Sequence, residues 1–170
     1  MPKPVSKPKD KPKYKKKRYP AQKKKKPQVI KGRVIPTKKT RGRITAVEYN
    51  EALRKHGETC WVCGNPNVEM HHVFPKKYSG ESGRGMWRNL RALCPEHHRG
   101  ENGVHGKNGN TLMIQLQEEH RKLYGKFYYM DRFDLFALGL IPNTAKEAYE
   151  TFMVKEEEHA KGDTSSEAEL

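Results

Sequence analysis

Three cysteines and a histidine form two short motifs with the spacing of metal ligands. Two residues separate Cys60 from Cys63, and two residues separate Cys94 from His97. Thiolate sulfur and imidazole nitrogen together suit tetrahedral zinc, and Gly64 supplies the turn that a zinc knuckle requires. Three inert, buried cysteines are the weaker interpretation, because these residues stand among Gly, Pro and His rather than on an apolar face. The sequence therefore predicts a structural Zn²⁺ site.

A second set of polar residues is interleaved with the first. His71 and His72 follow the first motif, Asn89 precedes the second, and His98 follows it directly. Because a bound zinc ion would hold the two motifs together, we expect these side chains to converge. Zinc binding would also explain how a central segment rich in Gly, Pro, Cys and His can fold, since the metal contributes folding free energy.

This order of motifs resembles the HNH endonucleases of the ββα-metal fold. The matching strings are the Cys60–Cys63 pair, His-His-Val-x-Pro from residue 71, and Asn-Leu-x-x-Leu-Cys-x-x-His-His from residue 89. The continuation over residues 99–105 looks like the small stand-alone members that bacteriophages often carry. The resemblance covers about residues 58–110 and implies a β-hairpin followed by a helix. These elements would bind one catalytic divalent ion, for which Mg²⁺ and Mn²⁺ are the first candidates.

The resemblance also implies roles for the interleaved residues. His72 matches the general base that activates a water molecule, and Asn89 matches the residue that positions the loop and the base. His71 and His98 match ligands of the catalytic ion. The residues themselves leave open whether His71 or His72 is the base, and His72 is the preferred candidate.

For the structural zinc, the resemblance implies four ligands: Cys60, Cys63, Cys94 and His97. His97 stands where many relatives have a fourth cysteine, and imidazole is also a good zinc ligand. His105 is an alternative fourth ligand. It is equally compatible with a further metal ligand, a phosphate contact or a surface residue.

The chemistry of phosphodiester hydrolysis fits these residue types. An imidazole with an ordinary pKa near 6.5 can take a proton from water at neutral pH. A divalent ion can stabilise the charge on the phosphorane and on the departing 3′-oxygen. The base must keep its lone pair, which favours different roles for His71 and His72. Because neighbours on a regular strand point to opposite faces, we expect the strand to end there, near Pro75.

Five basic residues near the motifs are candidates for holding substrate phosphates: Arg84, Arg88, Arg91, Lys76 and Lys77. For each of them, an exposed loop charge is an equally good interpretation. Trp61 and Trp87 are predicted to pack around the zinc site, and the aromatic residues 127–129 to pack between helices.

Helices are predicted on both sides of this centre. Thr45 and Glu48 form a capping box that begins a helix ending at His56, before Gly57. Further helices are predicted over residues 111–124, 131–140 and 144–159, the last beginning with a second capping box. The acidic residues 161–170 are expected to be flexible.

The charge of the chain is divided unevenly. The 170 residues carry a formal net charge of +15, and residues 1–43 hold 19 lysines and arginines against a single acid, Asp10. Prolines and repulsion between like charges predict that this arm is extended and disordered. Such a segment binds polyanions, so DNA is the expected partner, through phosphate contacts that carry no sequence specificity. A solubilising tail or a localisation signal is the alternative.

The sequence as a whole predicts a small α+β protein. Its zinc-stabilised ββα-metal core has flanking helices and a disordered basic N-terminal arm. The expected divisions are an arm over residues 1–43, a nuclease domain over 44–125, a helical extension over 126–160 and a tail over 161–170. No apolar run approaches the roughly 18 residues of a membrane span, and the N-terminus lacks the apolar core of a secretory signal.

The predicted function is metal-dependent hydrolysis of DNA, by nicking or cutting, with 5′-phosphate and 3′-hydroxyl products. The expected location is the cytoplasm, that of the host if a bacteriophage encodes the chain. One competing hypothesis is a non-catalytic zinc module that binds DNA, and another is an accessory protein of phage packaging or replication. The combination of His72, Asn89 and His98 favours the nuclease, because a binding module does not need all three.

Overall fold

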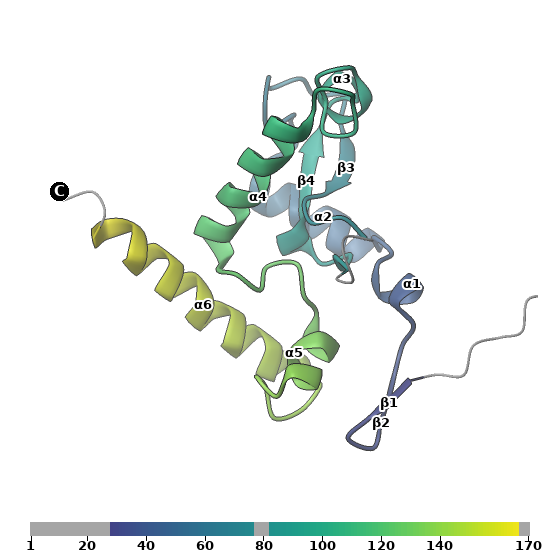
Figure 1. Ribbon diagram of the computed structural model, residues 1–170, viewed down its shortest axis with the longest axis vertical. Coiled ribbons are helices and arrows are strands. Elements are labelled where there is room, and N and C mark those ends of the chain that lie inside the picture. Colours follow the sequence, from purple (N-terminus) through teal and green to yellow (C-terminus); the bar gives the residue numbers. More distant parts are fainter. Residues whose placement is uncertain (1–27, 77–81, 167–170) are drawn as a thin grey trace, which may run out of the picture.

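The computed structural model of the chain describes residues 28–76 and 82–166, and it is a small α+β protein (Figure 1). Within these ranges there are two antiparallel sheets of two strands each. The elements in chain order are β1 (Gln28–Ile30), β2 (Arg33–Ile35), α1 (Lys38–Arg41), α2 (Ala46–His56), β3 (Glu69–His72), a 3₁₀ turn (Trp87–Asn89), β4 (Leu90–Leu93), α3 (Pro95–Arg99), α4 (Asn110–Tyr124), α5 (Arg132–Leu138) and α6 (Lys146–Ser166). None of the helices in these ranges is long and apolar enough to span a bilayer.

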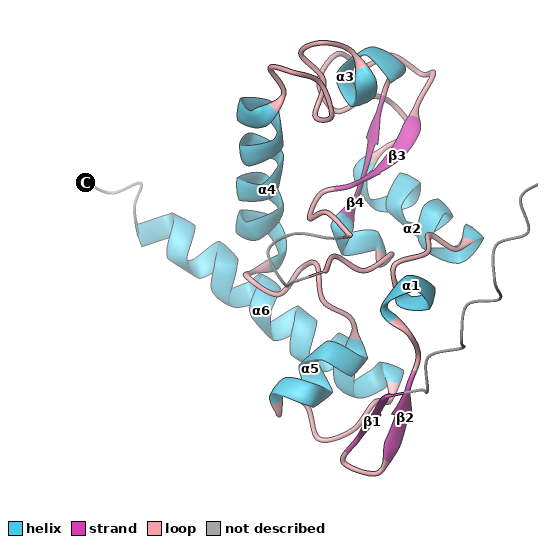
Figure 2. Cartoon of the chain, turned by 45° about the vertical axis from the view of Figure 1, so that its right-hand side comes forward, coloured by secondary structure: helices cyan, strands magenta, loops and turns pink. Residues whose placement is uncertain are grey.

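The hairpin of β3 and β4 lies between α4 and α2, with α3 at its upper end (Figure 2). The strands pair with Glu69 opposite Leu93 and His72 opposite Leu90. Helix α2 packs against β4, and α3 follows β4 directly. Cys94 is the N-cap of α3, and Pro95 occupies the first turn, where its missing N–H is harmless. The chain therefore brings the two predicted metal-ligand motifs to the same hairpin.

The main apolar core lies beside this hairpin and under α4. Its buried members are Cys60, Val73, Leu93, Cys94, Val104, Leu116 and Tyr128. Leu116 on α4 is completely buried, which stabilises the fold by about 1.5–3 kcal/mol. A second cluster joins α5 to α6 through Leu135, Phe136, Ile141, Tyr149 and Met153. Because these cores are small, polar contacts must contribute much of the structural specificity.

Ordered structure begins before the predicted start at residue 44. Residues 28–35 form a hairpin, and α1 follows it, so the expectation of a disordered arm is wrong for residues 28–43. Lys31 and Gly32 both have positive φ angles, 46° and 74°, as a tight hairpin turn requires. Ile35 is only 2% exposed. The high charge of the segment concealed this short apolar pattern; residues 1–27 of the predicted arm lie outside the described residues.

The predicted helix over residues 45–56 is confirmed, but half of its capping box is not. Thr45 Oγ1 accepts a hydrogen bond from the Glu48 amide at 3.3 Å. The Glu48 carboxylate accepts one from the Trp87 amide at 2.7 Å and thereby ties α2 to the 3₁₀ turn. The Glu48 side chain thus binds the distant Trp87 amide in place of the Thr45 amide that the capping box would use.

The C-terminal helices are present with different ends. Helix α5 is begun by a capping box of Asp131 and Asp134 and is ended by Gly139, whose φ is 78°, just before the predicted end at residue 140. Helix α6 continues to Ser166, past the predicted end at residue 159. The expected flexible tail is therefore helical over residues 161–166, and residues 167–170 lie outside the described residues.

A buried histidine, His120, and a half-buried one, His56, lie behind β4. His120 is completely buried, donates from Nδ1 to the Arg88 carbonyl at 2.7 Å, and leaves Nε2 without a hydrogen-bond partner. His56 accepts at Nδ1 from Arg91 at 2.8 Å, so it is also neutral. Burial lowers the pKa of His120 to about 3 and that of His56 to about 4.

These low pKa values predict a loss of stability in acid. Above pH 6.5 both histidines are neutral in the folded and unfolded chains. As the pH falls from 6.5 towards the folded-state pKa, only the unfolded chain takes up these protons. The His120 contribution should therefore fall by about 1.4 kcal/mol per pH unit. Urea unfolding between pH 7 and pH 5 tests this, and His120→Asn should show a shallower dependence. Equal slopes for the two proteins would contradict the prediction.

Candidate metal centres

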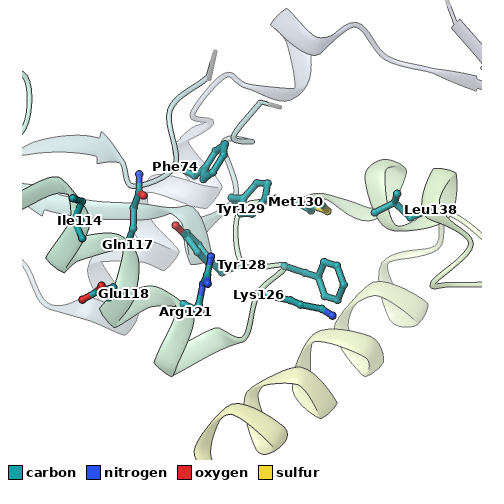
Figure 3. A pocket seen from close by; sticks show the side chains of 11 residues that line it. Phe74, Ile114, Gln117, Glu118, Arg121, Lys126, Tyr128, Tyr129, Met130 and Leu138 are labelled. Atoms are coloured by element: carbon teal, nitrogen blue, oxygen red, sulfur yellow. The ribbon is translucent and has the colours of Figure 1, made fainter. Parts of the chain in front are cut away.

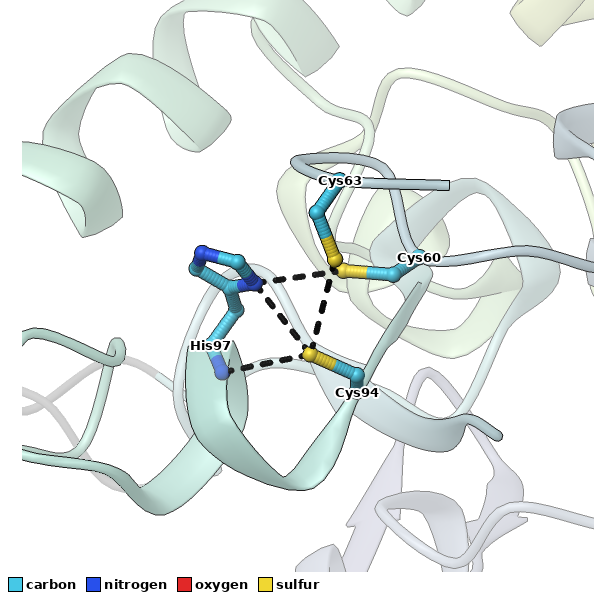
Figure 4. Close-up of side chains that lie close together, drawn as sticks. All are labelled: Cys60, Cys63, Cys94 and His97. Carbon is cyan, nitrogen blue, oxygen red and sulfur yellow. Dashed lines mark hydrogen bonds between the residues drawn. The ribbon is translucent and has the colours of Figure 1, made fainter. Parts of the chain in front are cut away.

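Cys60, Cys63, Cys94 and His97 converge on one point (Figure 4). Their ligand atoms all lie within 4.8 Å of one another, with Cys94 Sγ 3.2 Å from His97 Nδ1 and Cys63 Sγ 3.8 Å from Cys94 Sγ. The first pair stands on a turn closed by the hydrogen bond from the Gly64 amide to the Cys60 carbonyl. The second pair stands on the first turn of α3. The four residues form one cluster.

The donor set of this Cys₃His cluster fits a tetrahedral metal ion such as zinc. Three sulfurs and one imidazole nitrogen are the ligand types that structural zinc prefers. Burial opposes ionisation of Cys60, but hydrogen bonds from the Cys94, Cys63 and Val62 amides outweigh it and lower the pKa of the thiol to about 6. A low thiol pKa favours metal binding, because the thiolate is the ligand. His97 rather than His105 completes this cluster.

His105 instead joins His71 and His98 in a second cluster, whose ligand atoms also lie within 4.8 Å of one another. The ring centroids are 4.9 Å apart for His71 and His105, and 5.2 Å apart for His71 and His98. Backbone hydrogen bonds from Val104 to His97 and from His105 to His98 fold the segment after α3 back onto that helix. Sequence analysis left His105 unassigned, because this return of the chain is not evident from local spacing.

His71 is the most unusual member of this three-histidine cluster. It is 2% exposed, and neither ring nitrogen has a hydrogen-bond partner among the described residues. Burial, together with the charges of neighbouring histidines, lowers its pKa to about 3. Burial also lowers the pKa of His105. A buried polar atom without a partner is unfavourable unless something binds it, so three imidazoles at this distance fit a divalent cation.

The carboxylate of Glu69 supports the cluster from β3. Its Oε2 lies 2.7 Å from Nδ1 of His98, and its other oxygen pairs with Arg99. A carboxylate on one ring nitrogen fixes the orientation of a histidine and leaves Nε2 for a metal ion. Sequence analysis missed Glu69, although its place two residues before His71 on the same strand was a possible signal.

His72 lies outside the three-histidine cluster. Its Nε2 is 3.1 Å from the carbonyl oxygen of Gly42, which can only accept, so Nε2 carries the proton and Nδ1 keeps the lone pair. Burial is the main cause that lowers the pKa of His72 to about 4. Strand β3 ends at this residue, as expected. His71 and His72 therefore have different surroundings, one among imidazoles and the other against backbone.

Asn89 fixes the segment that follows His72. Its side chain is completely buried, accepts from the Phe74 amide at 2.7 Å, and donates to the carbonyls of Phe74 and Arg84 at 3.2 and 2.9 Å. Its own carbonyl accepts from Val73 at 2.9 Å. The predicted positioning role of Asn89 for this loop agrees with these contacts.

The three arginines that were candidates for phosphate contact are buried and ion-paired. Arg84 bonds Asp134 at 2.6 Å, Arg88 bonds Glu157 at 2.7 Å, and Arg91 bonds Glu119 at 2.6 Å. Their exposed fractions are 3%, 3% and 8%. The guanidinium groups are therefore engaged with carboxylates inside the fold, and phosphate contact is the wrong interpretation for them. Lys76 is exposed, and Lys77 lies outside the described residues.

The aromatic residues 127–129 are part of the packing, as predicted. Tyr128 is 3% exposed in the main core, and Tyr129 stacks on Phe74 with ring centroids 4.0 Å apart. They line one side of a pocket of about 640 Å³, with Arg121 and Lys126 nearby (Figure 3). Trp61 packs against the core that contains Cys60, whereas Trp87 packs with Ala52 and Leu90 in a separate cluster.

A network of four charged residues links the N-terminal segment to α5. Arg41 bonds Asp131 at 2.7 Å and Asp134 at 2.9 Å, and Asp134 also binds Arg84. The next residue after Arg41 is Gly42, whose carbonyl contacts His72, and the Arg84 carbonyl contacts Asn89. The network therefore helps to hold in place the backbone groups that contact His72 and Asn89.

No family model, curated protein or solved structure matches this chain.

The separate positions of His97 and His105 predict different effects on a thiolate-bound metal. In cobalt-substituted protein, His97→Ala should weaken or alter the thiolate-to-cobalt absorption, and Cys94→Ser should reduce that metal from about one equivalent to below half an equivalent per chain. His105→Ala should leave the absorption unchanged. Metal content by mass spectrometry completes the measurement. The reverse pattern for the two histidines would refute the assignment.

Breaking the charged network should destabilise the fold. Asp134→Asn leaves two buried arginines short of a counter-charge, and we expect a loss of about 3–5 kcal/mol in the free energy of unfolding. Glu51→Gln removes an exposed pair with Arg54 and should have almost no effect. Urea titration of both variants measures the difference, and equal stabilities would contradict a structural role for the network.

Proposed function

We propose that this protein is a metal-dependent endonuclease of the HNH type that hydrolyses phosphodiester bonds in DNA. The observation that carries the proposal is His71, a buried imidazole whose unpartnered nitrogens face His98 and His105. His72 follows it on the same strand, with a lone pair on Nδ1. A divalent cation site beside a neutral histidine base is what hydrolysis of a phosphodiester requires.

The order of the elements supports the resemblance on which the proposal also rests. HNH endonucleases carry their motif on a hairpin followed by a helix. In this chain His71 and His72 stand on β3, Asn89 directly before β4, and His98 on α3. The contacts of Asn89 with Phe74 and Arg84 support its proposed role in positioning the loop beside the base.

In the proposed reaction, His72 removes a proton from a water molecule through Nδ1 while Gly42 holds Nε2–H. The water oxygen forms a bond to phosphorus, and the bond from phosphorus to the 3′-oxygen breaks. The 3′-oxygen leaves and is protonated, which gives 5′-phosphate and 3′-hydroxyl ends. A divalent ion bound by His71, His98 and His105 would supply Lewis-acid stabilisation of the phosphorane and the leaving oxygen.

The ligand chemistry widens the choice of catalytic ion. Mg²⁺ and Mn²⁺ were expected, but Mg²⁺ prefers oxygen ligands. Three imidazoles also suit Ni²⁺, Fe²⁺ or Zn²⁺. Assays should therefore include these ions beside Mg²⁺ and Mn²⁺.

DNA affinity is proposed to come from the basic N-terminal residues 1–43, by neutralisation of phosphates without sequence preference. The corresponding location is the cytoplasm, where DNA of the host or of a bacteriophage is accessible. A non-catalytic zinc-containing DNA-binding protein, or an accessory protein of phage packaging or replication, would use the same arm without cleavage.

The nuclease prediction concerns supercoiled plasmid DNA. The wild type should nick it in a metal-dependent manner, and His72→Ala should slow nicking by about 10²–10⁴-fold, because the general base is lost. His98→Ala should also slow nicking and raise the metal concentration at which nicking is half-maximal. His159→Ala is a matched control, since this histidine lies exposed on α6. Gel analysis of nicked and linear products over time measures the rates.

Each variant should retain its Cys₃His metal and its melting temperature, so that a loss of rate reports chemistry rather than unfolding. DNA binding without metal-dependent nicking by the wild type would favour the accessory function. Equal nicking by the wild type and His72→Ala would exclude His72 as the base.

A further inference from the structure

The N-terminal hairpin projects from the body of the molecule. Strands β1 and β2 lie at the end beyond α5, away from the central hairpin (Figures 1 and 2). We call residues 28–35 the hairpin ribbon. Their register pairs Gln28 with Ile35, Val29 with Val34, and Ile30 with Arg33. Each strand has three residues, so the ribbon is about 10 Å long.

One face of the ribbon is fixed to the protein. Ile35 is buried, and Ile30 packs against the cluster that joins α5 and α6. At the turn, Lys31 Nζ lies 3.5 Å from the Phe136 carbonyl and 5.2 Å from the centre of its ring. The ribbon is therefore held against α5 in a defined orientation.

The other face is apolar and exposed. Val29 and Val34 are cross-strand partners, and alternation along the strands places them on the face opposite Ile30 and Ile35. Their exposed fractions are 60% and 63%. The hairpin is anchored by its inner face, so these outward valines have no function in the packing of the described residues.

The surroundings of the ribbon are strongly basic. Residues 28–43 contain six lysines and arginines and no acid, and they continue directly from the basic residues 1–27. In the described part of the chain, Arg33, Lys38 and Lys39 have no carboxylate within ion-pair distance, although several other arginines do. This local excess of free positive charge is complementary to a polyanion.

We propose that the hairpin ribbon enters the major groove of duplex DNA, with Val29 and Val34 against the base edges and Lys38 and Lys39 near the phosphates; Arg33 lies on the face of Ile30 and is not part of this contact. The major groove, about 12 Å wide, admits a two-stranded ribbon, and valine methyl groups can contact thymine methyls there. The ribbon proposal rests on the proposed function, because that function identifies the ligand as DNA. It names a structured contact with duplex in addition to the arm.

The charged half of the proposal is tested in the full-length protein. Lys38→Gln and Lys39→Gln together should weaken binding to a fluorescent 20-base-pair duplex and reduce the slope of log affinity against log salt by about 2. The control variant, Lys107→Gln with Lys122→Gln, removes two exposed lysines elsewhere and should change the slope by less than about 1. Equal effects of the two double variants would overturn the proposal.

The apolar half has its own variant. Val29→Ser with Val34→Ser should weaken duplex binding by about tenfold without changing the salt slope, because no charge is lost. The loss should be much smaller on a single strand of the same sequence, which has no groove. Since both side chains are exposed, the melting temperature should be unchanged. An unchanged duplex affinity, or an equal loss on single strands, would overturn groove insertion.

Two further measurements distinguish DNA binding by the ribbon from self-association of the protein and from the proposed nuclease activity. Sedimentation of wild type and the valine variant tests self-association through the ribbon; a dimer that the variant dissolves would replace DNA as the occupant and overturn the proposal. Metal-dependent hydrolysis of bis(4-nitrophenyl) phosphate by the wild type tests the candidate site on a small ester without a groove. If that hydrolysis is absent while the ribbon variants still lose duplex affinity, the proposed function fails and the ribbon proposal stands.

Discussion

The side-chain amide of Asn89 is the contact on which the arrangement of the centre depends. It is buried where β4 begins, and it binds the backbone of Phe74 on one side and of Arg84 on the other. Such a buried amide must be satisfied, because each unpaired polar atom would destabilise the fold by about 1–3 kcal/mol. Phe74 and Arg84 are therefore held at fixed positions relative to the start of β4. Arg84 also pairs with Asp134, and Asp134 pairs with Arg41. The residue after Arg41 is Gly42, whose carbonyl oxygen accepts a hydrogen bond from His72.

Buried ion pairs fix the arrangement of helices that a larger apolar core would otherwise fix. The described chain has small apolar clusters, and between them Arg84, Arg88 and Arg91 each reach an acid on a C-terminal helix. These pairs are sensitive to geometry, since a charge left without its partner is strongly destabilising. They bind α4, α5 and α6 to the hairpin in one defined arrangement. The helices after residue 110 are thus part of the support of the centre rather than an appendage to it.

The two candidate metal centres are divided by ligand type. The three cysteine sulfurs lie with His97 in one cluster. The imidazoles of His71, His98 and His105 form the other. Adjacent residues of α3, His97 and His98, serve different clusters because successive side chains on a helix point in different directions. A set rich in thiolate suits a closed structural site. A set of imidazoles can leave coordination positions open for water or substrate.

The sequence alone determined the ligand types, the three cysteines of the Cys₃His cluster and the helices at 45–56 and 111–124, because these depend on short spacings and on local capping. It also indicated that Asn89 would fix the loop beside His72. The choice of His97 over His105 as the fourth ligand came from the tertiary structure. Only the tertiary structure decided that His105 belongs with His71, that Glu69 supports His98, and that the three arginines face inward. Each of these depends on segments far apart in the chain, and an arginine has the same local sequence signal whether it meets a phosphate or a buried carboxylate. The hairpin at residues 28–35 was hidden for a related reason: it is stabilised by Ile30 and Lys31 against α5 and by the burial of Ile35, whereas its composition resembles that of an unfolded basic arm.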